Sequence, residues 1–278
     1  MEYRAVVTDL DGTLCTDRKL HERDKRAIER TLEKDIPVIP ATTRMRFSTS
    51  LILKELNIDR YPLICNNGAR VLGPGWKEDG RYEEWYERRL NRDVAEELIL
   101  YADKKDYEIS TIFSEKKFWR KRRIQRNNKL EPDTVTELVE NNIDALDEDT
   151  PLSLMMHSYM NGLEGLKDFE SYAKNFFQNI KLDRHHKSQK WIALTVYSSE
   201  VSKQKALELV CEMMDIPIDE VLAIGDDQVD IGILKSAGKG IAMGNSPPSV
   251  KEIADEIAPS CKNQGVEWTL KKYILDES

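Results

Sequence analysis

The segment RAVVTDLDGT, residues 4–13, decides the fold. It begins with a short β-branched run around Val6 and Val7 and ends in two aspartates and a glycine. Such a run predicts a strand followed by a tight turn. In an open parallel sheet, ligands bind beyond the carboxyl ends of the strands. Asp9 and Asp11 therefore stand where a functional site is expected.

Outward from this strand, helical and strand-like patterns alternate along the chain. Residues 221–225, VLAIG, are apolar without alternation, which is typical of a strand buried on both faces. The alternation predicts an α/β fold, a doubly wound parallel-sheet (Rossmann-like) core with crossover helices. The other expected strands are 36–41, 62–65 and 192–197, and the expected helices are 22–34, 47–56, 203–214, 229–237, 248–254 and 266–274.

The pattern of expected helices and strands changes in the middle of the chain. We expect residues 82–190 to form a smaller inserted α/β domain, called the cap domain below, so that the core consists of residues 1–81 and 191–278. Within the cap the patterns predict helices at 91–105, 132–141 and 163–178 and strands at 107–113 and 152–158.

Composition excludes several classes of protein. At 278 residues, against about 150 per domain, one large or two modest domains are expected. The net charge of −8 argues against a general binder of nucleic acid or anionic membranes. No apolar run approaches the roughly 20 residues of a spanning helix, no secretory signal pattern is visible, and the four cysteines are scattered. These features predict a cytoplasmic protein with reduced thiols and no membrane partner, and they leave the oligomeric state open.

Two acid clusters follow expected strands. Asp9 and Asp11 can take different roles, since one carboxylate can act as a nucleophile or metal ligand while the other donates or accepts a proton. Asp226 and Asp227 close the strand VLAIG, and Asp230 follows one helical turn later. Such carboxylates suit Mg²⁺, which prefers oxygen ligands. The alternative, a helix cap at Asp226 or Asp227, explains one of these residues but not all three.

Weaker signals lie after other strands and at one helix start. Thr42 and Thr43 follow an apolar run, where a hydroxyl and backbone amides can hold phosphate oxygens or cap a helix. Lys203 stands where a cation opposes the helix dipole, which a bound phosphate would offset. A solvated surface lysine is the alternative, and Lys205 is a local competitor for the role.

Arg44, Asn66 and Asn67 are further candidates. Arg44 can reach a phosphate or form a salt bridge. Asn66 and Asn67 follow an expected strand, where they can contact substrate, hold a domain hinge or form an Asx-turn.

The expected cap contains a strongly basic segment. Residues 116–129 carry eight Lys or Arg and no acid. Three interpretations remain open: a solvated edge strand protected by its charge, a wall that binds a second anion of the substrate, and a nucleic-acid surface, which the acidic total disfavours.

Six segments follow one another along the chain: DLDGT at 9–13, ATTR at 41–44, NNGA at 66–69, VSKQKAL at 201–207, GDDQVD at 225–230 and IAMGNSP at 241–247. In this order they resemble the motifs of the haloacid dehalogenase-like hydrolases, and the cap resembles that of the Cof-type phosphatases. The resemblance implies a catalytic core and Mg²⁺-dependent hydrolysis of a small phosphorylated metabolite through an aspartyl-phosphate intermediate. The implied metabolite is a sugar phosphate, a nucleotide or a cofactor phosphate.

The same resemblance implies roles for individual residues. Asp9 corresponds to the nucleophile and Asp11 to the general acid and base. Thr42 and Lys203 correspond to the phosphoryl-binding groups, with Thr43 beside them. The implied Mg²⁺ ligands are the Asp9 carboxylate, the Asp11 carbonyl and the Asp226 carboxylate. Asp230 is implied to support the metal or to hold Lys203. Possible substrate or supporting residues are Arg44, Asn66, Asn67, Asp227 and Asn245.

Three positions depart from the family pattern. Thr43 and Gln204 replace glycines, and Val229 replaces an asparagine. A valine offers no polar group, so phosphate affinity or turnover is expected to fall unless Asn245 substitutes. Val229 suggests one alternative, a catalytically weak phosphometabolite-binding protein on the same fold. A second alternative is chemically adjacent: a phosphomutase or phosphotransferase, in which a sugar hydroxyl replaces water as the acceptor.

Overall fold

The protein forms two compact units in the computed structural model. The first unit contains residues 1–86 and 202–278, and the second contains residues 87–201. The divisions expected from the sequence, at 81/82 and 190/191, fall 5 and 11 residues before these. The structure describes residues 3–16, 19–75, 83–114, 116–120, 136–139, 141–147, 149–159, 163–188 and 191–277.

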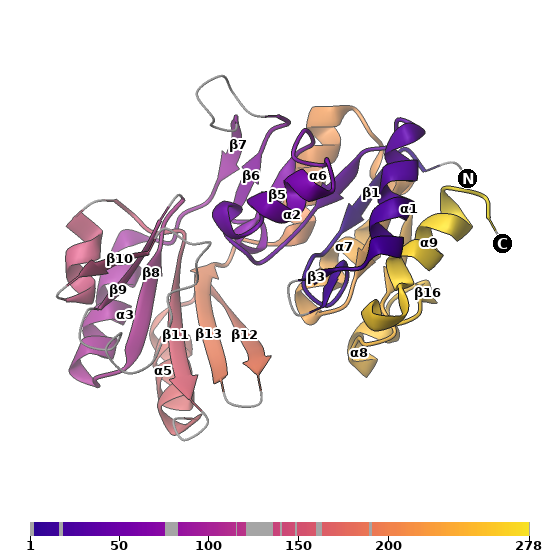
Figure 1. Cartoon of the computed structure of the whole chain (residues 1–278). Helices are drawn as coiled ribbons and strands as arrows, with labels where there is room; N and C mark the ends of the chain where they lie inside the picture. Colours follow the sequence, from indigo (N-terminus) through magenta and orange to yellow (C-terminus); the bar gives the residue numbers. More distant parts are fainter. Residues whose placement is uncertain are drawn as a thin grey trace. The chain divides into compact units, whose positions relative to one another are not determined.

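A five-stranded parallel sheet forms the centre of the first unit (Figure 1). Its register places Thr8 beside Ile224 on one side and Pro40 on the other, so three strands end at one edge of the sheet. The residues that follow those strands are thereby brought together. In spatial order the strands are β16 (Glu256–Ile257), β15 (Lys239–Ala242), β14 (Val221–Gly225), β1 (Ala5–Thr8) and β4 (Val38–Pro40).

Helices cover both faces of this sheet. Successive strand side chains point to opposite faces, and Val6 and Val7 accordingly belong to two different buried clusters. The cluster around Val6 includes residues of α1 (Glu22–Glu33), α2 (Ser50–Glu55) and α9 (Gly265–Tyr273). The cluster around Val7 includes residues of α6 (Lys203–Met214), α7 (Ile231–Ser236) and α8 (Pro248–Lys251). The predicted doubly wound α/β core is confirmed.

Short elements complete the first unit. A parallel bridge from Ala41 to Ile64 connects the main sheet to a second, three-stranded sheet. That sheet consists of β5 (Leu63–Cys65), β6 (Arg70–Leu72) and β7 (Glu84–Glu87), and a hairpin of β2 (Cys15–Thr16) and β3 (Lys19–Leu20) follows β1. The 3₁₀ turns are η1 (Arg46–Ser48), η2 (Asn66–Gly68), η5 (Ile218–Glu220), η6 (Gln228–Asp230) and η7 (Cys261–Asn263).

The second unit is built on a six-stranded mixed sheet. Two helices, α3 (Arg92–Lys104) and α5 (Leu163–Phe176), pack on it around the fully buried Phe169. The turn η3 (Asn142–Asp147) also contributes to this core. In spatial order the strands are β10 (Thr136–Val139), β9 (Lys117–Arg120), β8 (Glu108–Ile112), β11 (Ser153–Tyr159), β13 (Trp191–Ser198) and β12 (Ile180–Ser188).

Two expected elements differ from the structure. Residues 136–139 form β10, which pairs in parallel with β9, so the helix expected at 132–141 is wrong over these residues. The strand expected at 192–197 is present as β13, but it pairs with β11 and β12 of the second unit. Of the basic segment 116–129, residues 121–129 lie outside the described residues.

A search of the described segments for membrane-spanning helices gave none long and apolar enough. The four cysteines all lie in described segments, where they are buried and form no disulfide.

Candidate active site

The loop after β1 carries the first acid pair. Asp9 is 6% exposed, and its backbone N–H donates to the carbonyl of Ile224, which joins the ends of β1 and β14. The turn that follows depends on Gly12, whose φ of +89° lies in the left-handed region. A Cβ at Gly12 would lie 2.2 Å from Oδ2 of Asp226. Glycine therefore lets this loop approach the second acid cluster.

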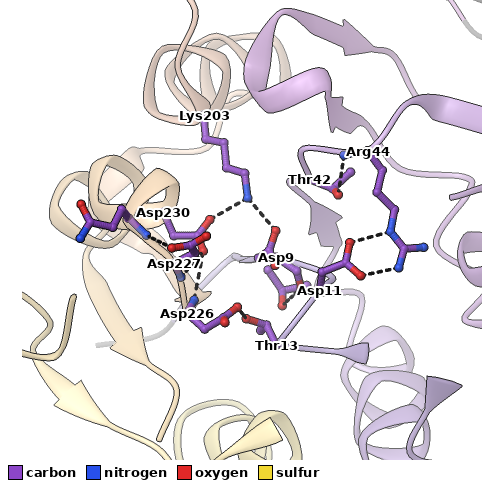
Figure 2. A network of polar contacts seen from close by, with 11 residues as sticks. Asp9, Asp11, Thr13, Thr42, Arg44, Lys203, Asp226, Asp227 and Asp230 are labelled. Carbon is purple, nitrogen blue, oxygen red and sulfur yellow. Dashed lines mark hydrogen bonds and ion pairs between the residues drawn. The ribbon is translucent and has the colours of Figure 1, made fainter. Parts of the chain in front are cut away.

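Lys203 connects the two acid clusters (Figure 2). It is the first residue of α6, and the Ser202 side chain caps that helix by accepting a hydrogen bond from the Lys205 amide. The Lys203 ammonium donates to Oδ1 of Asp9 and to Oδ1 of Asp230, each at 2.6 Å. Its side chain is fully buried. The cation therefore lies between carboxylates that come from β1 and from the turn after β14.

Asp230 organises the second acid cluster. Its Oδ2 accepts hydrogen bonds of 3.0 Å from the backbone amides of Asp226 and Asp227, while its Oδ1 accepts from Lys203. The Asp227 side chain is exposed and caps η6 by accepting from the Gln228 amide. Asp230 thus fixes the loop that presents Asp226, whereas Asp227 has the capping role that the sequence left open.

Two further side chains orient Asp226. The Thr13 hydroxyl donates to Oδ1 of Asp226 at 2.8 Å, and the Asn245 amide donates to Oδ2 at 3.1 Å. The same amide donates to the carbonyl of Gly12 at 2.9 Å. Thr13 was missing from the candidate residues, although it closes the DLDGT motif. Its position after the turn glycine was the available signal.

Asp11 faces a guanidinium group. Arg44 donates to both carboxylate oxygens of Asp11, with a distance of 2.6 Å between Nε and Oδ2 (Figure 2). Half of the Asp11 side chain is exposed, and that of Arg44 is mostly covered. The Thr42 hydroxyl lies in the same loop, is fully buried and accepts from the Arg44 amide at 3.0 Å. Thr42 and Arg44 are therefore parts of one loop that faces Asp11.

The remaining candidates support that loop. The backbone N–H of Asn66 donates to the carbonyl of Arg44 at 2.9 Å, and the backbone N–H of Asn67 donates to the carbonyl of Thr42 at 3.0 Å. Both asparagines are buried and have positive φ values, of 49° and 60°, which asparagine tolerates better than most residues. Their backbones hold the Thr42 loop in place. Thr43 is half-buried beside Thr42.

Burial and mutual repulsion shift the acidity of the cluster. Burial raises the pKa of Asp226 to about 7, and the charge of Asp230 adds to the shift. Burial also raises the pKa of Asp9 well above its usual range, against the opposing charge of Lys203. Burial alone would lower the pKa of Lys203, but Asp230 and Asp9 outweigh this effect and raise it. A second positive charge would therefore stabilise the ionised acids.

The acids are close enough to share a cation. Asp9, Asp226 and Asp230 each offer a carboxylate oxygen, and these oxygens lie within 4.8 Å of one another. Oxygen ligands at such separations, in a site whose acids are destabilised by burial, fit a hard divalent cation.

Lys203 and its carboxylate partners form a buried centre at the carboxyl edge of the parallel α/β sheet. The chain belongs to the haloacid dehalogenase-like hydrolases, because the sequence profile of that family matches residues 6–270. The family predicted from the motifs is therefore confirmed.

Relatives and solved structures agree with this assignment. The 5-amino-6-(5-phospho-D-ribitylamino)uracil phosphatase YitU of Bacillus subtilis is 26% identical over 97% of both chains. YcsE of the same organism, which is also named a 5-amino-6-(5-phospho-D-ribitylamino)uracil phosphatase, is 25% identical over 99% of this chain and 97% of its own. A haloacid dehalogenase-like hydrolase from Bacteroides thetaiotaomicron superposes with a TM-score of 0.80, at 22% identity, over 98% of this chain and 99% of that one. This last likeness shows the fold.

Proposed function

We propose that this phosphoric monoester hydrolase is Mg²⁺-dependent and cleaves a small phosphorylated metabolite through an aspartyl-phosphate intermediate on Asp9. The observation that carries the proposal is the position of Lys203, which donates to Asp9 and to Asp230 at 2.6 Å. A carboxylate can attack a phosphate dianion only where positive charge offsets their repulsion. Lys203 provides such a charge beside the attacking oxygen.

The first chemical step transfers the phosphoryl group. A carboxylate oxygen of Asp9 attacks phosphorus, the bond from phosphorus to the ester oxygen breaks, and Asp11 gives its proton to the departing oxygen. Lys203 and the Thr42 hydroxyl hold the phosphoryl oxygens. In the structure Arg44 donates to both oxygens of Asp11, so one of these oxygens must leave the guanidinium before Asp11 can carry the proton that it transfers.

The second step regenerates the enzyme. Asp11, now ionised, takes a proton from water, and the resulting hydroxide attacks the phosphorus of the aspartyl phosphate. The bond between phosphorus and the Asp9 oxygen breaks, which releases inorganic phosphate and restores both carboxyl groups. One residue therefore acts as acid and then as base.

The acid cluster is the proposed Mg²⁺ site. The carboxylates of Asp9 and Asp226 and the backbone carbonyl of Asp11 would hold the ion. Asp230 would act mainly through Lys203 and the loop amides, because its Oδ1 accepts from the Lys203 ammonium and its Oδ2 accepts from two backbone amides. When bound, Mg²⁺ supplies Lewis-acid neutralisation of the phosphoryl oxygens.

We assign substrate selection to the second unit, which would act as the cap domain. The groups that hold the phosphoryl moiety all belong to the first unit and would serve any phosphate ester. The named activities of YitU and YcsE make 5-amino-6-(5-phospho-D-ribitylamino)uracil the first compound to test, beside sugar phosphates, nucleotides and cofactor phosphates.

The test is release of inorganic phosphate from p-nitrophenyl phosphate and from this panel, with Mg²⁺ or with EDTA. The proposal predicts turnover that EDTA abolishes, that added Mg²⁺ restores, and that Asp9→Asn lacks. Ligand binding without turnover would instead support the binding-protein alternative associated with Val229. Transfer of phosphate to a sugar acceptor, with little free phosphate, would support the phosphotransferase alternative.

A further inference from the structure

The helices α1 and α9 are neighbours in the first unit (Figure 1). Side chains of these two helices line a hollow. Its volume is about 190 Å³. The small side chain of Ala27 is buried in it, and longer side chains of both helices surround it. The other lining residues are Arg23, Arg26, Arg30, Glu267 and Lys271.

The lining is strongly cationic in a chain whose net charge is −8. Four cations and one carboxylate leave the lining with a charge of +3. The spacing of Arg23, Arg26 and Arg30 puts them on one side of α1, where like charges at i,i+3 and i,i+4 repel one another. The helix therefore carries an unfavourable concentration of charge at this place.

Neighbouring acids neutralise this charge only in part. Glu267 accepts from Arg23 at 3.1 Å and from Lys271 at 3.0 Å, and its side chain is 13% exposed. Arg30 pairs with Glu277 outside the lining. Asp24, a buried residue of α1, is directed to the start of α9, where its Oδ1 accepts from the backbone amide of Glu267 at 2.7 Å.

Arg26 is the cation that remains available. Its side chain is exposed, and within the described segments no acid forms an ion pair with it. Arg26 and Arg30 are four positions apart on α1, and both line the hollow together with Ala27. A guanidinium that no carboxylate holds can donate paired hydrogen bonds to the oxygens of one oxyanion.

We propose that this hollow is a binding site for a small multivalent oxyanion, such as a phosphate or pyrophosphate group, separate from the acid-lined centre. The hollow lies between α1 and α9, whereas that centre lies at the carboxyl ends of β1 and β14. Arg26 is its main anion-binding group, Arg30 and Lys271 add charge although they also pair with Glu277 and Glu267, and Ala27 leaves the space that the anion occupies.

Trp268 supplies a local probe, because it follows Glu267 on α9 and its ring lies 4.9 Å from the ammonium of Lys272. The experiment follows the indole N–H signals of ¹⁵N-tryptophan-labelled protein during titration with inorganic pyrophosphate, in EDTA and at constant ionic strength. Trp268→Phe assigns the signal. Wild type is compared with Arg26→Glu and with Lys235→Glu, an equal charge reversal at an exposed position on α7.

The proposal predicts a saturable shift of the Trp268 signal in wild type. In Arg26→Glu the apparent affinity falls at least tenfold, and in Lys235→Glu it stays within twofold of wild type. The absence of a saturable shift would overturn the proposal, and so would equal weakening by both variants, which would indicate general electrostatic attraction. The readout does not involve turnover, so it is independent of the proposed phosphatase activity.

Discussion

The ammonium of Lys203 lies 2.6 Å from Oδ1 of Asp230, and both side chains are completely buried. Lys203 begins α6 and Asp230 ends η6, and the packing of α6 against η6 and α7 brings the two residues together although they are 27 positions apart. A buried charge that loses its partner typically costs about 3–5 kcal/mol. This pair therefore links the stability of the core to the integrity of the candidate site.

Removal of the lysine should destabilise the protein. In Lys203→Met the carboxylates of Asp9 and Asp230 lose their cation, so we expect the free energy of unfolding to fall by about 3–5 kcal/mol and phosphatase activity to be lost. Urea unfolding at neutral pH measures the first effect. The control is Lys205→Met on the same helix, where the lysine is exposed, and it should change stability by less than about 0.5 kcal/mol. Equal effects of the two substitutions would contradict this account.

Two glycines with positive φ provide a matched comparison. Alanine at Gly12 would bring its Cβ to 2.2 Å from Asp226, whereas Gly75, with a φ of +74°, has no atom within 4 Å of the corresponding position. Gly75→Ala should cost about 1 kcal/mol, for the backbone conformation alone. Gly12→Ala should cost clearly more and should abolish activity, because Asp226 or the loop must move. Thermal unfolding and p-nitrophenyl phosphate turnover of both variants test this, and retained activity in Gly12→Ala would count against it.

The raised pKa of Asp24 predicts that the free energy of unfolding depends on pH. Burial raises its pKa from 3.8 to about 6, against the hydrogen bond from the Glu267 amide. The folded state thus binds this proton more tightly than the unfolded state does, so the stabilising contribution is present below about pH 4 and is lost as pH rises through 6. The corresponding loss is at most about 3 kcal/mol.

The measurement is urea unfolding of wild type and Asp24→Asn between about pH 4 and about pH 7, a range that spans the two pKa values. The side-chain amide of the variant keeps an oxygen that can accept from the Glu267 amide, but it does not titrate. We expect wild type to lose stability relative to the variant as pH rises. A difference between the two proteins that does not change with pH would refute the assignment of this shift to Asp24.

Asp11 should matter most for substrates with poor leaving groups. An alkyl phosphate needs a proton on the departing oxygen, whereas p-nitrophenolate leaves without one. Asp11→Asn should therefore slow alkyl phosphates by roughly 10²–10⁴-fold, and it should release the first p-nitrophenolate much faster than later ones, because the variant lacks the base for hydrolysis. Stopped-flow absorbance measures the burst of p-nitrophenolate, and steady-state phosphate release measures the turnover of the alkyl phosphates. Equal losses on both substrates without a burst would exclude the acid and base roles.

Much of the core could be predicted from local sequence. The run VLAIG at 221–225 is buried on both faces as β14, and its apolar character without alternation is the physical reason that it was recognisable. Because parallel strands end at one edge, the acids after two such runs were expected to meet. The structure brings together Asp9, Asp226 and Asp230.

Contacts distant in sequence could not be predicted. Residues 136–139 have no periodicity that distinguishes an edge strand from a helix. They form a strand because they pair with β9, a contact that is distant in sequence. Likewise, the pattern at 192–197 indicated a strand but not the sheet to which β13 belongs. The fork of Arg44 on Asp11 depends on side-chain directions across two loops, so the sequence left open whether Arg44 faces a phosphate or an acid.

The central claim is that Asp9 becomes phosphorylated, and a covalent trap tests it most directly. Asp11→Asn protein is mixed with p-nitrophenyl phosphate and Mg²⁺, quenched in acid within the first turnover, digested, and analysed by peptide mass spectrometry. The account predicts one phosphoryl group on the peptide that contains Asp9, and none after the same treatment of the Asp9→Asn, Asp11→Asn double variant. A burst of p-nitrophenolate with no phosphoryl group on that peptide, or with the group on another residue, would contradict it.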